Sequence, residues 1–371
     1  MAIRQLSPDD LSVGSKLPWN VFDLHGRLLL RIGQVLESQR QIDGLCERGL
    51  FTDGKTTRIE EAEATPPPDR ISAFSLILEA RHRLELACAP NASRDNFADH
   101  IARVCALIGQ ALKLNKDAAM ATMLLNREVR YSIRHSVDAA MITQIVASFV
   151  GMQESELASI TAAALTMNIS MLAKQDELQH HQQPLTDEER QIIHHHPLES
   201  RNLLLQFDVS DELWLNIVQD HHEAIDGSGY PAKKTGDDIL LPTRIVSLSD
   251  IYCARVTGRD YRPPLRPNAA LRAIFLGQGA VEKFLSVQFI KALGVFPPGT
   301  PVRLTNGEIA IVTHQGEKAN APLVASVIGP RGVPFASPIK RDTSLSLYSV
   351  REAVDFSELG GTANIQAIWK Q

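Results

Sequence analysis

Helical periodicity dominates the middle of this 371-residue chain. From Ile71 onward, segments such as ISAFSLILEARHRLELACA and HSVDAAMITQIVASFV place apolar residues at intervals of three and four. Such spacing gathers apolar side chains on one face of an α-helix. It recurs in successive segments to about residue 295. The sequence therefore predicts a mainly α fold, with a helical bundle over residues 71–295.

The N-terminal part follows a different pattern. Residues 1–55 contain two short β-prone runs around His25-Gly26, followed by a helix-like run that stops at Gly49. We expect a small α+β domain there. The polar segment 56–70 includes three consecutive prolines, which exclude a helix and favour an extended chain, so it is predicted to be a linker.

The C-terminal part, residues 296–371, has β character. Asn306-Gly307 lies between two β-prone runs, which is a strong signal for a β-hairpin, and APLVASVIG would add a further strand. We expect a β-rich extension, built on this hairpin, that packs on the helical domain.

Composition narrows the range of functions. The formal net charge is -5, which argues against a dedicated partner of nucleic-acid polymers, since these proteins usually carry a basic face. The N-terminus does not resemble a signal peptide, and no apolar run approaches the roughly 18 residues that span a membrane. The four cysteines are far apart and form no CxxC pair, as is typical of reduced thiols. We therefore predict a cytoplasmic chain without a membrane span.

Histidines are concentrated in one part of the sequence. Of 12 histidines, eight lie between His135 and His222. His196 precedes a proline, and His221 and His222 close a predicted helix, while Asp250 lies in a later helix. Imidazoles and a carboxylate that converge in a helical bundle would suit zinc, manganese or iron. The alternative is that the acidic residues of DHHEAIDG only terminate a helix. His180 and His181 are expected in solvent, as are two of the three histidines of HHHP.

The segment DHHEAIDGSGYP (220–231) resembles the HHExxDGxGYP signature of the HD-GYP branch of the HD phosphohydrolases. Its flanks are also similar to this family: YSIRHS at 131–136, HHP at 195–197, and LSDIYCARVTGRDYRPPL at 248–265. The resemblance extends over about residues 125–310. It implies an HD-domain helical bundle that binds metal ions, commonly iron or manganese, and hydrolyses the bacterial second messenger cyclic di-GMP.

The resemblance also implies roles for individual residues. His135 and Asp250 would be ligands of one metal, and His196, His221 and His222 would be ligands of the other. The ligand-binding residues would be the loop that gives the family its name, together with two arginines suited to phosphate: Gly227, Gly229, Tyr230, Pro231, Arg259 and Arg262.

The chain departs from the family pattern at residues 165–171. Where the family reads LLHDIGK, this chain reads LTMNISM. Met167 replaces the histidine, Asn168 replaces the aspartate, and Met171 replaces the lysine. A thioether is a poor ligand for these metals, and a neutral amide cannot bridge two cations as a carboxylate does. We therefore predict no catalytic residues, and either no cofactor or a single divalent metal.

The leading hypothesis is a degenerate, catalytically inactive HD-GYP protein of bacterial cyclic di-GMP signalling. It would sense cyclic di-GMP or act as a scaffold for signalling proteins such as diguanylate cyclases. A small N-terminal domain suits homodimerisation or partner contact. The alternative is a metal-dependent phosphodiesterase that uses the three-histidine site, with Glu223, Asp226 or Asp250 as acid or base. A third hypothesis is that burial alone explains the motif and no ligand binds.

Overall fold

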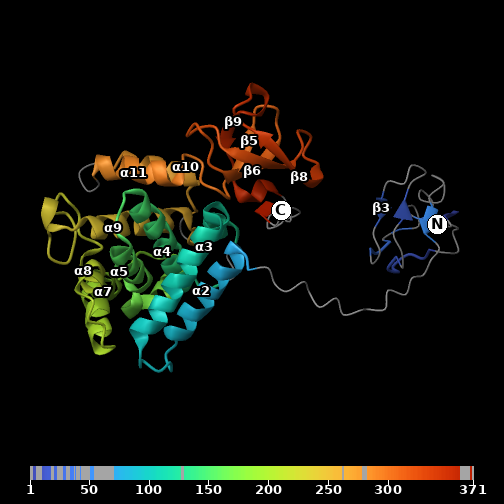
Figure 1. The fold of residues 1–371 in the computed structure, drawn as a ribbon. Coiled ribbons are helices and arrows are strands. Elements are labelled where there is room, and N and C mark those ends of the chain that lie inside the picture. The colour runs from blue at the N-terminus through green and yellow to red at the C-terminus, as the bar shows by residue number, and fades with distance from the viewer. Residues whose placement is uncertain are drawn as a thin grey trace. The chain divides into compact units, whose positions relative to one another are not determined.

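The computed structural model divides the chain into two compact units, Met1–Arg70 and Ile71–Gln371 (Figure 1). In the second unit it describes residues 71–126, 129–260, 263–277, 282–359 and 368–369. In the first unit it describes residues 3–5, 11–17, 21–22, 28–30, 34–36, 38, 42 and 51–53.

The first unit contains a four-stranded antiparallel sheet in the order β1-β4-β2-β3. β2 pairs with β3 on either side of His25-Gly26, as the two β-prone runs predict. The predicted linker 56–70 lies outside the described residues, as does the predicted helix before Gly49 except for Ile42, which is helical. The strands are β1 (Ile3–Gln5), β2 (Val21–Phe22), β3 (Leu28–Leu30) and β4 (Phe51–Asp53).

Helices form most of the second unit, as the three- and four-residue spacing of apolar side chains predicts. Several begin at side chains that accept a hydrogen bond from the first turn, including Ser72, Thr186 and Asp211. The helices are α2 (Ala73–Ala87), α3 (Phe97–Leu125), α4 (Tyr131–Phe149), α5 (Glu154–Thr166), α6 (Leu172–Gln179), α7 (Asp187–Gln206), α8 (Glu212–Asp220), α9 (Leu241–Val256), α10 (Pro267–Phe275) and α11 (Lys283–Leu293).

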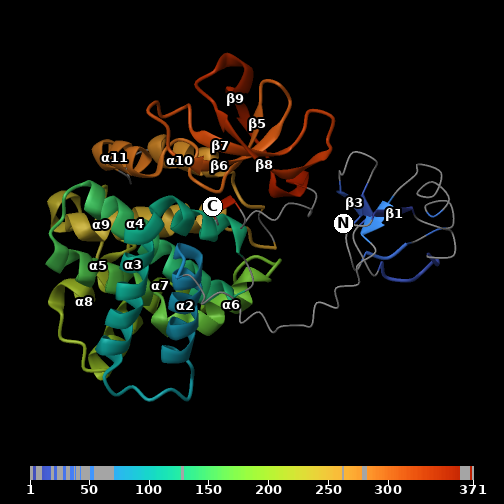
Figure 2. The ribbon, with the colours of Figure 1, turned by 45° about the vertical axis from the view of Figure 1, so that its right-hand side comes forward.

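Helix α4 is the central element of the bundle. Nearly all of its residues are buried, and it packs against α2, α3, α5, α6, α9 and α11 (Figure 2). A helix that is apolar on every side is expected in such a position. Because α4 carries His135, its central position takes this imidazole into the interior of the bundle.

Helix α3 is kinked at Asn115, where the backbone is not helical (φ -161°, ψ 95°). The Asn115 side chain accepts a hydrogen bond from the backbone N–H of Ala118 at 2.9 Å, so it caps the second half of the helix. The kink thus divides α3 into two helical segments.

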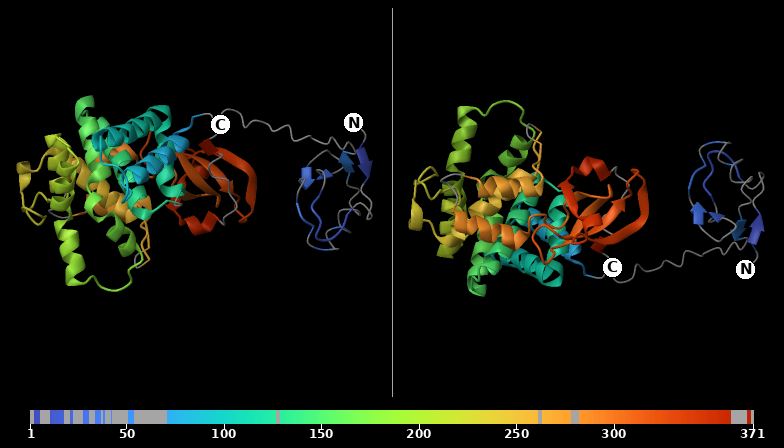
Figure 3. Two further views of the ribbon diagram at one scale, coloured as in Figure 1. Left: turned by 90° about the horizontal axis from the view of Figure 1, so that it is seen from below. Right: turned by 90° about the horizontal axis from the view of Figure 1, so that it is seen from above.

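The C-terminal part is a five-stranded antiparallel sheet in the order β8-β7-β6-β5-β9. The predicted hairpin is confirmed, because β5 and β6 pair across Asn306-Gly307 and Gly307 has a φ of +87°. It is only part of a larger sheet, which lies beside the helices in Figure 3. The strands are β5 (Pro301–Leu304), β6 (Ile309–His314), β7 (Leu323–Ile328), β8 (Pro334–Asp342) and β9 (Val350–Ala353).

One stretch, Glu154–Gln179, has the length and mean hydropathy of a membrane span. However, 61% of its 18-residue apolar window is buried within the protein, and Met167–Met171 interrupt the α-helical conformation. A core helix of a globular domain has the same composition, so this stretch is weak support for a membrane span.

Candidate metal and ligand site

Three histidines predicted as ligands of one metal lie together. His196 comes from α7, and His221 and His222 directly follow α8. One ring nitrogen from each residue lies within 4.8 Å of the others. Among the described residues this is the one group of three or more His, Cys, Asp or Glu side chains close enough to share a metal. The arrangement therefore offers three nitrogen ligands for a metal, one from α7 and two from the residues that follow α8.

Hydrogen bonds fix the tautomers of two of these rings. The Nδ1 of His196 donates to the carbonyl oxygen of Ile193 at 2.5 Å, and the Nδ1 of His221 donates to that of Val218 at 2.7 Å. A carbonyl oxygen can only accept, so both protons are on Nδ1 and both Nε2 atoms carry lone pairs. These two Nε2 atoms are 3.2 Å apart.

Two lone pairs at this separation repel each other unless a cation lies between them. Nitrogen ligands in a tetrahedral zinc site are each about 2.0–2.1 Å from the metal and so about 3.3 Å from one another. The backbone carbonyls that orient the rings are typical outer partners of metal-binding histidines. The histidine cluster therefore fits one divalent metal.

Burial keeps the histidines neutral. Burial, together with neighbouring His221, lowers the pKa of His196 to about 3. Burial also lowers the pKa values of His221 and His222. At neutral pH all three rings are uncharged, which is the form that binds metal.

The two residues predicted as ligands of the other metal form a pair with each other. The Nε2 of His135 lies 2.7 Å from Oδ1 of Asp250, and the His135 side chain is 1% exposed. Burial alone would raise the pKa of Asp250, but the hydrogen bond and charge of His135 and the nearby imidazoles hold this pKa below its usual range. His135 and Asp250 thus satisfy one another without a metal, although Nδ1 of His135 has no partner.

The residues that depart from the HD-GYP pattern, 167–171, lie between α5 and α6. Met167 is 0% exposed and belongs to the main hydrophobic core, and Asn168 and Met171 are also buried. The hydroxyl of Ser170 donates to the carbonyl oxygen of His196 at 3.1 Å, which ties this segment to α7. The thioether of Met167 is therefore packed among apolar side chains, and that of Met171 is shielded from solvent.

Glycine is required at one position of the loop that follows the histidines. A Cβ atom at Gly229 would lie 2.3 Å from the backbone nitrogen of Ala224 and 2.5 Å from the carbonyl oxygen of His222, so only glycine fits. Gly227 has a φ of +77°, which also favours glycine. These contacts fold the loop back over His222, and the backbone N–H of Tyr230 donates to the carbonyl oxygen of His222 at 3.1 Å.

Tyr230 lies between two histidine rings. Its ring centroid is 4.4 Å from that of His194 and 4.7 Å from that of His222, and both pairs are stacked. The expectation that two histidines of HHHP lie in solvent is confirmed, because His194 and His195 are exposed and His196 is buried. The sequence does not predict the stacking of His194 on Tyr230, because Tyr230 comes from a distant loop.

Glu223 and Asp226 hold the loop rather than the histidines. Glu223 is 6% exposed and accepts hydrogen bonds from the backbone N–H groups of Ala232 at 2.5 Å and Lys234 at 2.9 Å. Asp226 accepts from both the backbone N–H and the hydroxyl of Ser228. These bonds occupy the carboxylates that the sequence offers as an acid or a base.

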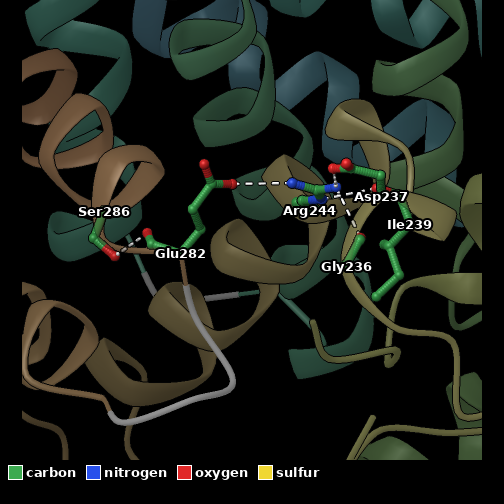
Figure 4. Close-up of polar contacts among 6 residues, drawn as sticks. All are labelled: Gly236, Asp237, Ile239, Arg244, Glu282 and Ser286. Atoms are coloured by element: carbon green, nitrogen blue, oxygen red, sulfur yellow. Dashed lines mark hydrogen bonds and ion pairs between the residues drawn. The ribbon is translucent and has the colours of Figure 1, made fainter. Parts of the chain in front are cut away.

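Arg244 connects the end of the loop, at residues 236–239, to Glu282 at the start of α11 (Figure 4). Its guanidinium donates to the carbonyl oxygens of Gly236 at 2.8 Å and Ile239 at 2.7 Å. It also pairs with Asp237 at 3.1 Å and Glu282 at 3.0 Å. The 220–239 segment is thus held at both ends.

Of the two arginines predicted to meet phosphate, Arg259 is described and Arg262 is not. Arg259 donates to the hydroxyl of Tyr131 at 3.3 Å, and its guanidinium lies 5.7 Å from the centre of that ring. Since Tyr131 also stacks on His135 at 5.6 Å, Arg259 lies on the side of the His135–Asp250 pair.

Comparisons with known proteins identify the relatives of this chain. Residues 118–281 match the HD domain family. The chain is 26% identical over 208 residues to cyclic di-GMP phosphodiesterase PA4108 of Pseudomonas aeruginosa, covering 56% of this chain and 50% of that protein. It is 27% identical over 154 residues to 3'3'-cGAMP-specific phosphodiesterase 1 of Vibrio cholerae, covering 42% and 36%. The chain therefore spans about half or less of the length of these relatives.

A solved structure gives the same fold. Bd1817, a HDG"Y"P protein from Bdellovibrio bacteriovorus, superposes with a TM-score of 0.51 and 14% sequence identity. The match covers 79% of this chain and 99% of Bd1817. At this identity the likeness concerns the fold alone.

Proposed function

We propose that this chain, which carries an HD domain and is homologous to the HD-GYP cyclic di-GMP phosphodiesterases, acts in cyclic di-GMP signalling by binding rather than by hydrolysis. The observation that carries the proposal is the state of residues 167 and 168. Met167 is 0% exposed in the hydrophobic core and Asn168 is 5% exposed, where the HD-GYP pattern has a histidine and an aspartate.

The loss of these two side chains removes what a pair of metals needs. Two-metal hydrolysis of a phosphodiester requires both ions about 3.5–4 Å apart, so that one activates water and both stabilise the transition state. Asn168 has no charge with which to bridge two cations, and Met167 is a poor ligand for them. The first metal would keep only His135 and Asp250, which already pair with each other at 2.7 Å.

Cyclic di-GMP binding is the first form of the proposal. Arg259 offers a guanidinium near the His135–Asp250 pair, which suits the phosphates of a nucleotide. The faces of the Tyr230 ring are stacked on His194 and His222, so this residue offers its edge and hydroxyl beside the histidine cluster. The second form is a scaffold that binds another signalling protein without the nucleotide.

Hydrolysis at a reduced metal site is the second candidate function. The histidine cluster, with two Nε2 atoms 3.2 Å apart, supports it because three imidazoles and an open position are a common catalytic zinc arrangement. A bound zinc ion would lower the pKa of a water molecule. Asp250 would then be the available carboxylate, since Glu223 and Asp226 are bonded to the loop.

Turnover of cyclic di-GMP tests the two candidates. The purified chain is loaded separately with Fe(II), Mn(II) and Zn(II), and the linear product is followed by chromatography beside an active HD-GYP enzyme. We expect no product above a metal-free control. Product that disappears in His221→Ala would overturn the proposal and establish the reduced metal site as catalytic.

Calorimetric titration with cyclic di-GMP then separates a sensor from a scaffold. A sensor binds the nucleotide, and Arg259→Ala weakens this binding by about ten-fold or more, because a charge-assisted hydrogen bond is lost. A scaffold that does not use the nucleotide shows no heat of binding in either protein.

A further inference from the structure

A groove with a volume of about 1020 Å³ runs along α3, away from the histidine cluster. Its described lining residues include none of the three histidines. The walls come from α3 and α5, and the floor comes from the end of α4 and from Trp214 of α8. The first half of the α3 wall carries small residues, among them Ala102, Ala106 and Gly109, and longer side chains follow from Gln110 onward.

The dimensions of the groove match a helix. Its α3 wall begins at Ala98 and reaches Lys116. At 1.5 Å per residue this is roughly 27 Å, the length of about 18 residues of α-helix. Small side chains along one wall allow another helix to approach closely, and large apolar side chains of that helix would then fill the groove. A compact small molecule would leave most of this length empty.

Charge divides the groove into two ends. Asp99 and Asp208 line one end, where the ring of Phe207 lies 5.0 Å from that of Phe97 at the start of α3. Lys113 and Lys116 line the other end together with Glu154. Asp211 also lines the groove, but its carboxylate accepts hydrogen bonds from Ser159 and from the backbone N–H of Trp214. Lys113 is 3.8 Å from Glu154, but both side chains are at least 80% exposed, so this pair is weak and leaves the lysine accessible.

We propose that this groove binds an amphipathic helix of a partner protein. The helix presents large apolar side chains on one face, basic side chains at the end near Asp99 and Asp208, and acidic side chains at the end near Lys113 and Lys116. The inference rests on the scaffold form of the proposed function, but it requires neither a metal nor a nucleotide, since the groove and the histidine cluster share no residue.

A second copy of this chain is the alternative occupant, and the charges disfavour it. For each α3 to lie in the groove of the other copy, the two-fold axis must run along the helices, so that the two α3 helices are parallel. Such a pairing brings Asp99 and Asp208 near the same residues of the other copy, and likewise the lysines. Like charges placed together weaken this dimer, whereas a helix of opposite charge order is attracted at both ends.

Two fluorescent peptides of about 18 residues test the proposal by fluorescence anisotropy with the full chain. Both have the same leucine face and the same composition, and they differ only in the order of their basic and acidic ends. We expect the peptide with the matching order to bind about ten-fold more tightly than the other. The variant Asp99→Lys with Lys113→Glu should reverse this preference.

Filling the groove provides the matched control. Ala106→Phe places a large side chain at an exposed position of the α3 wall, and we expect it to weaken binding by about ten-fold or more. His100→Phe adds the same side chain to an exposed position of α3 outside the lining, and it should bind the peptide like the parent. Thermal unfolding of both variants verifies that they are folded.

Three outcomes would overturn the inference: no binding of either peptide, equal binding of both, or binding that survives Ala106→Phe. A dimer of the parent that Ala106→Phe converts to a monomer would assign the groove to a second copy instead. Cyclic di-GMP binding and turnover are measured on the same variants. If the chain hydrolyses cyclic di-GMP, the proposed function is refuted, but the peptide measurements still decide whether the groove binds a helix.

Discussion

At the scale of single residues, three side chains set this chain apart from the HD-GYP sequence pattern. Met167 is buried in the main hydrophobic core, and Asn168 and Met171 are also buried. In the histidine cluster, by contrast, the carbonyl oxygens of Ile193 and Val218 hold the Nδ1 protons of His196 and His221. The three histidines thus form a group of nitrogen ligands, whereas Met167 belongs to the core.

Restoring the lost pair tests this separation. We expect Met167→His with Asn168→Asp to lower the free energy of unfolding by about 2 kcal/mol without metal, because polar groups are then buried with no partner. Mn(II) should recover part of this loss, since it binds only the folded chain. Denaturant unfolding with and without Mn(II) measures both effects.

Met167→Leu is the matched control for this variant. It keeps an apolar side chain of similar volume, so it should lose less than about 1.5 kcal/mol and show no response to Mn(II). A double variant as stable as the parent without metal would contradict the assignment of position 167 to the core.

The histidine cluster predicts a single zinc site. Zinc titration against a competing chelator should give one ion per chain at most, and His221→Ala should bind it at least about ten-fold more weakly, because one of three nitrogen donors is lost. His195→Ala is the control: His195 is exposed and its Nδ1 bonds to the carbonyl oxygen of Gln191 at 2.8 Å. Equal losses in both variants would show that the zinc binds elsewhere.

At the scale of elements, buried polar pairs connect helices that are far apart in the chain. Arg81 of α2 pairs with Asp138 of α4 at 2.7 Å, and the two side chains are 0% and 1% exposed. Arg81 also donates to the carbonyl oxygen of Asn126 at 3.3 Å, at the end of α3. These contacts fix the relative positions of the three helices that precede the site, and His135 lies one turn before Asp138 on α4.

Removing one partner of this pair should be costly. We expect Arg81→Ala or Asp138→Ala to lower the free energy of unfolding by about 3–5 kcal/mol, since each leaves an uncompensated charge in the core. Arg81→Met combined with Asp138→Leu should be much closer to the parent, because no buried charge is left. Urea unfolding of all three variants checks this, and single variants that lose less than about 1 kcal/mol would refute it.

At the scale of the whole molecule, the helical bundle and the C-terminal sheet form one unit. Phe74 of α2 packs against Trp369 with ring centroids 5.8 Å apart, and the side chain of Gln315 donates to the carbonyl oxygen of Ala292 in α11 at 3.0 Å. A Cβ atom at Gly299 would lie 3.0 Å from Cα of Ala121, so the chain entering the sheet passes directly over α3. We therefore expect the bundle and the sheet to unfold together.

The sheet gives this unit a specific dependence on pH. Burial raises the pKa of Glu308, but hydrogen bonds from Arg341 and Ser326 outweigh it, and the pKa is held below its usual value of 4.5. A lowered pKa in the folded state stabilises the fold above the usual value, and this contribution disappears as the pH falls through the folded pKa. Unfolding between about pH 6 and pH 3 should therefore show a steeper loss of stability in the parent than in Glu308→Gln.

Glu308→Gln keeps the shape of the side chain, so any difference in stability reflects the lost charge and not a change in packing. It should be less stable than the parent at neutral pH, because the bonds from Arg341 at 2.9 Å and 3.0 Å lose their charge. Identical pH profiles for the two proteins would remove Glu308 as the source of the dependence.

Local patterns in the sequence determine much of this protein. The three- and four-residue spacing of apolar side chains predicts the helices, and Asn306-Gly307 predicts the hairpin of β5 and β6. The motif residues predict that His196, His221 and His222 meet, which they do. These features depend on residues that are close in the chain or belong to one motif, so they can be predicted from the sequence alone.

Tertiary structure alone decides the remaining features, because they depend on contacts between distant segments. The stacking of Tyr230 on His194, the bonds that occupy Glu223, and the burial of Arg81 against Asp138 have no local pattern. The extension of one hairpin into five strands and the groove along α3 also arise only when separate elements pack. Packing selects a partner for each side chain by shape and burial, and a linear pattern records neither.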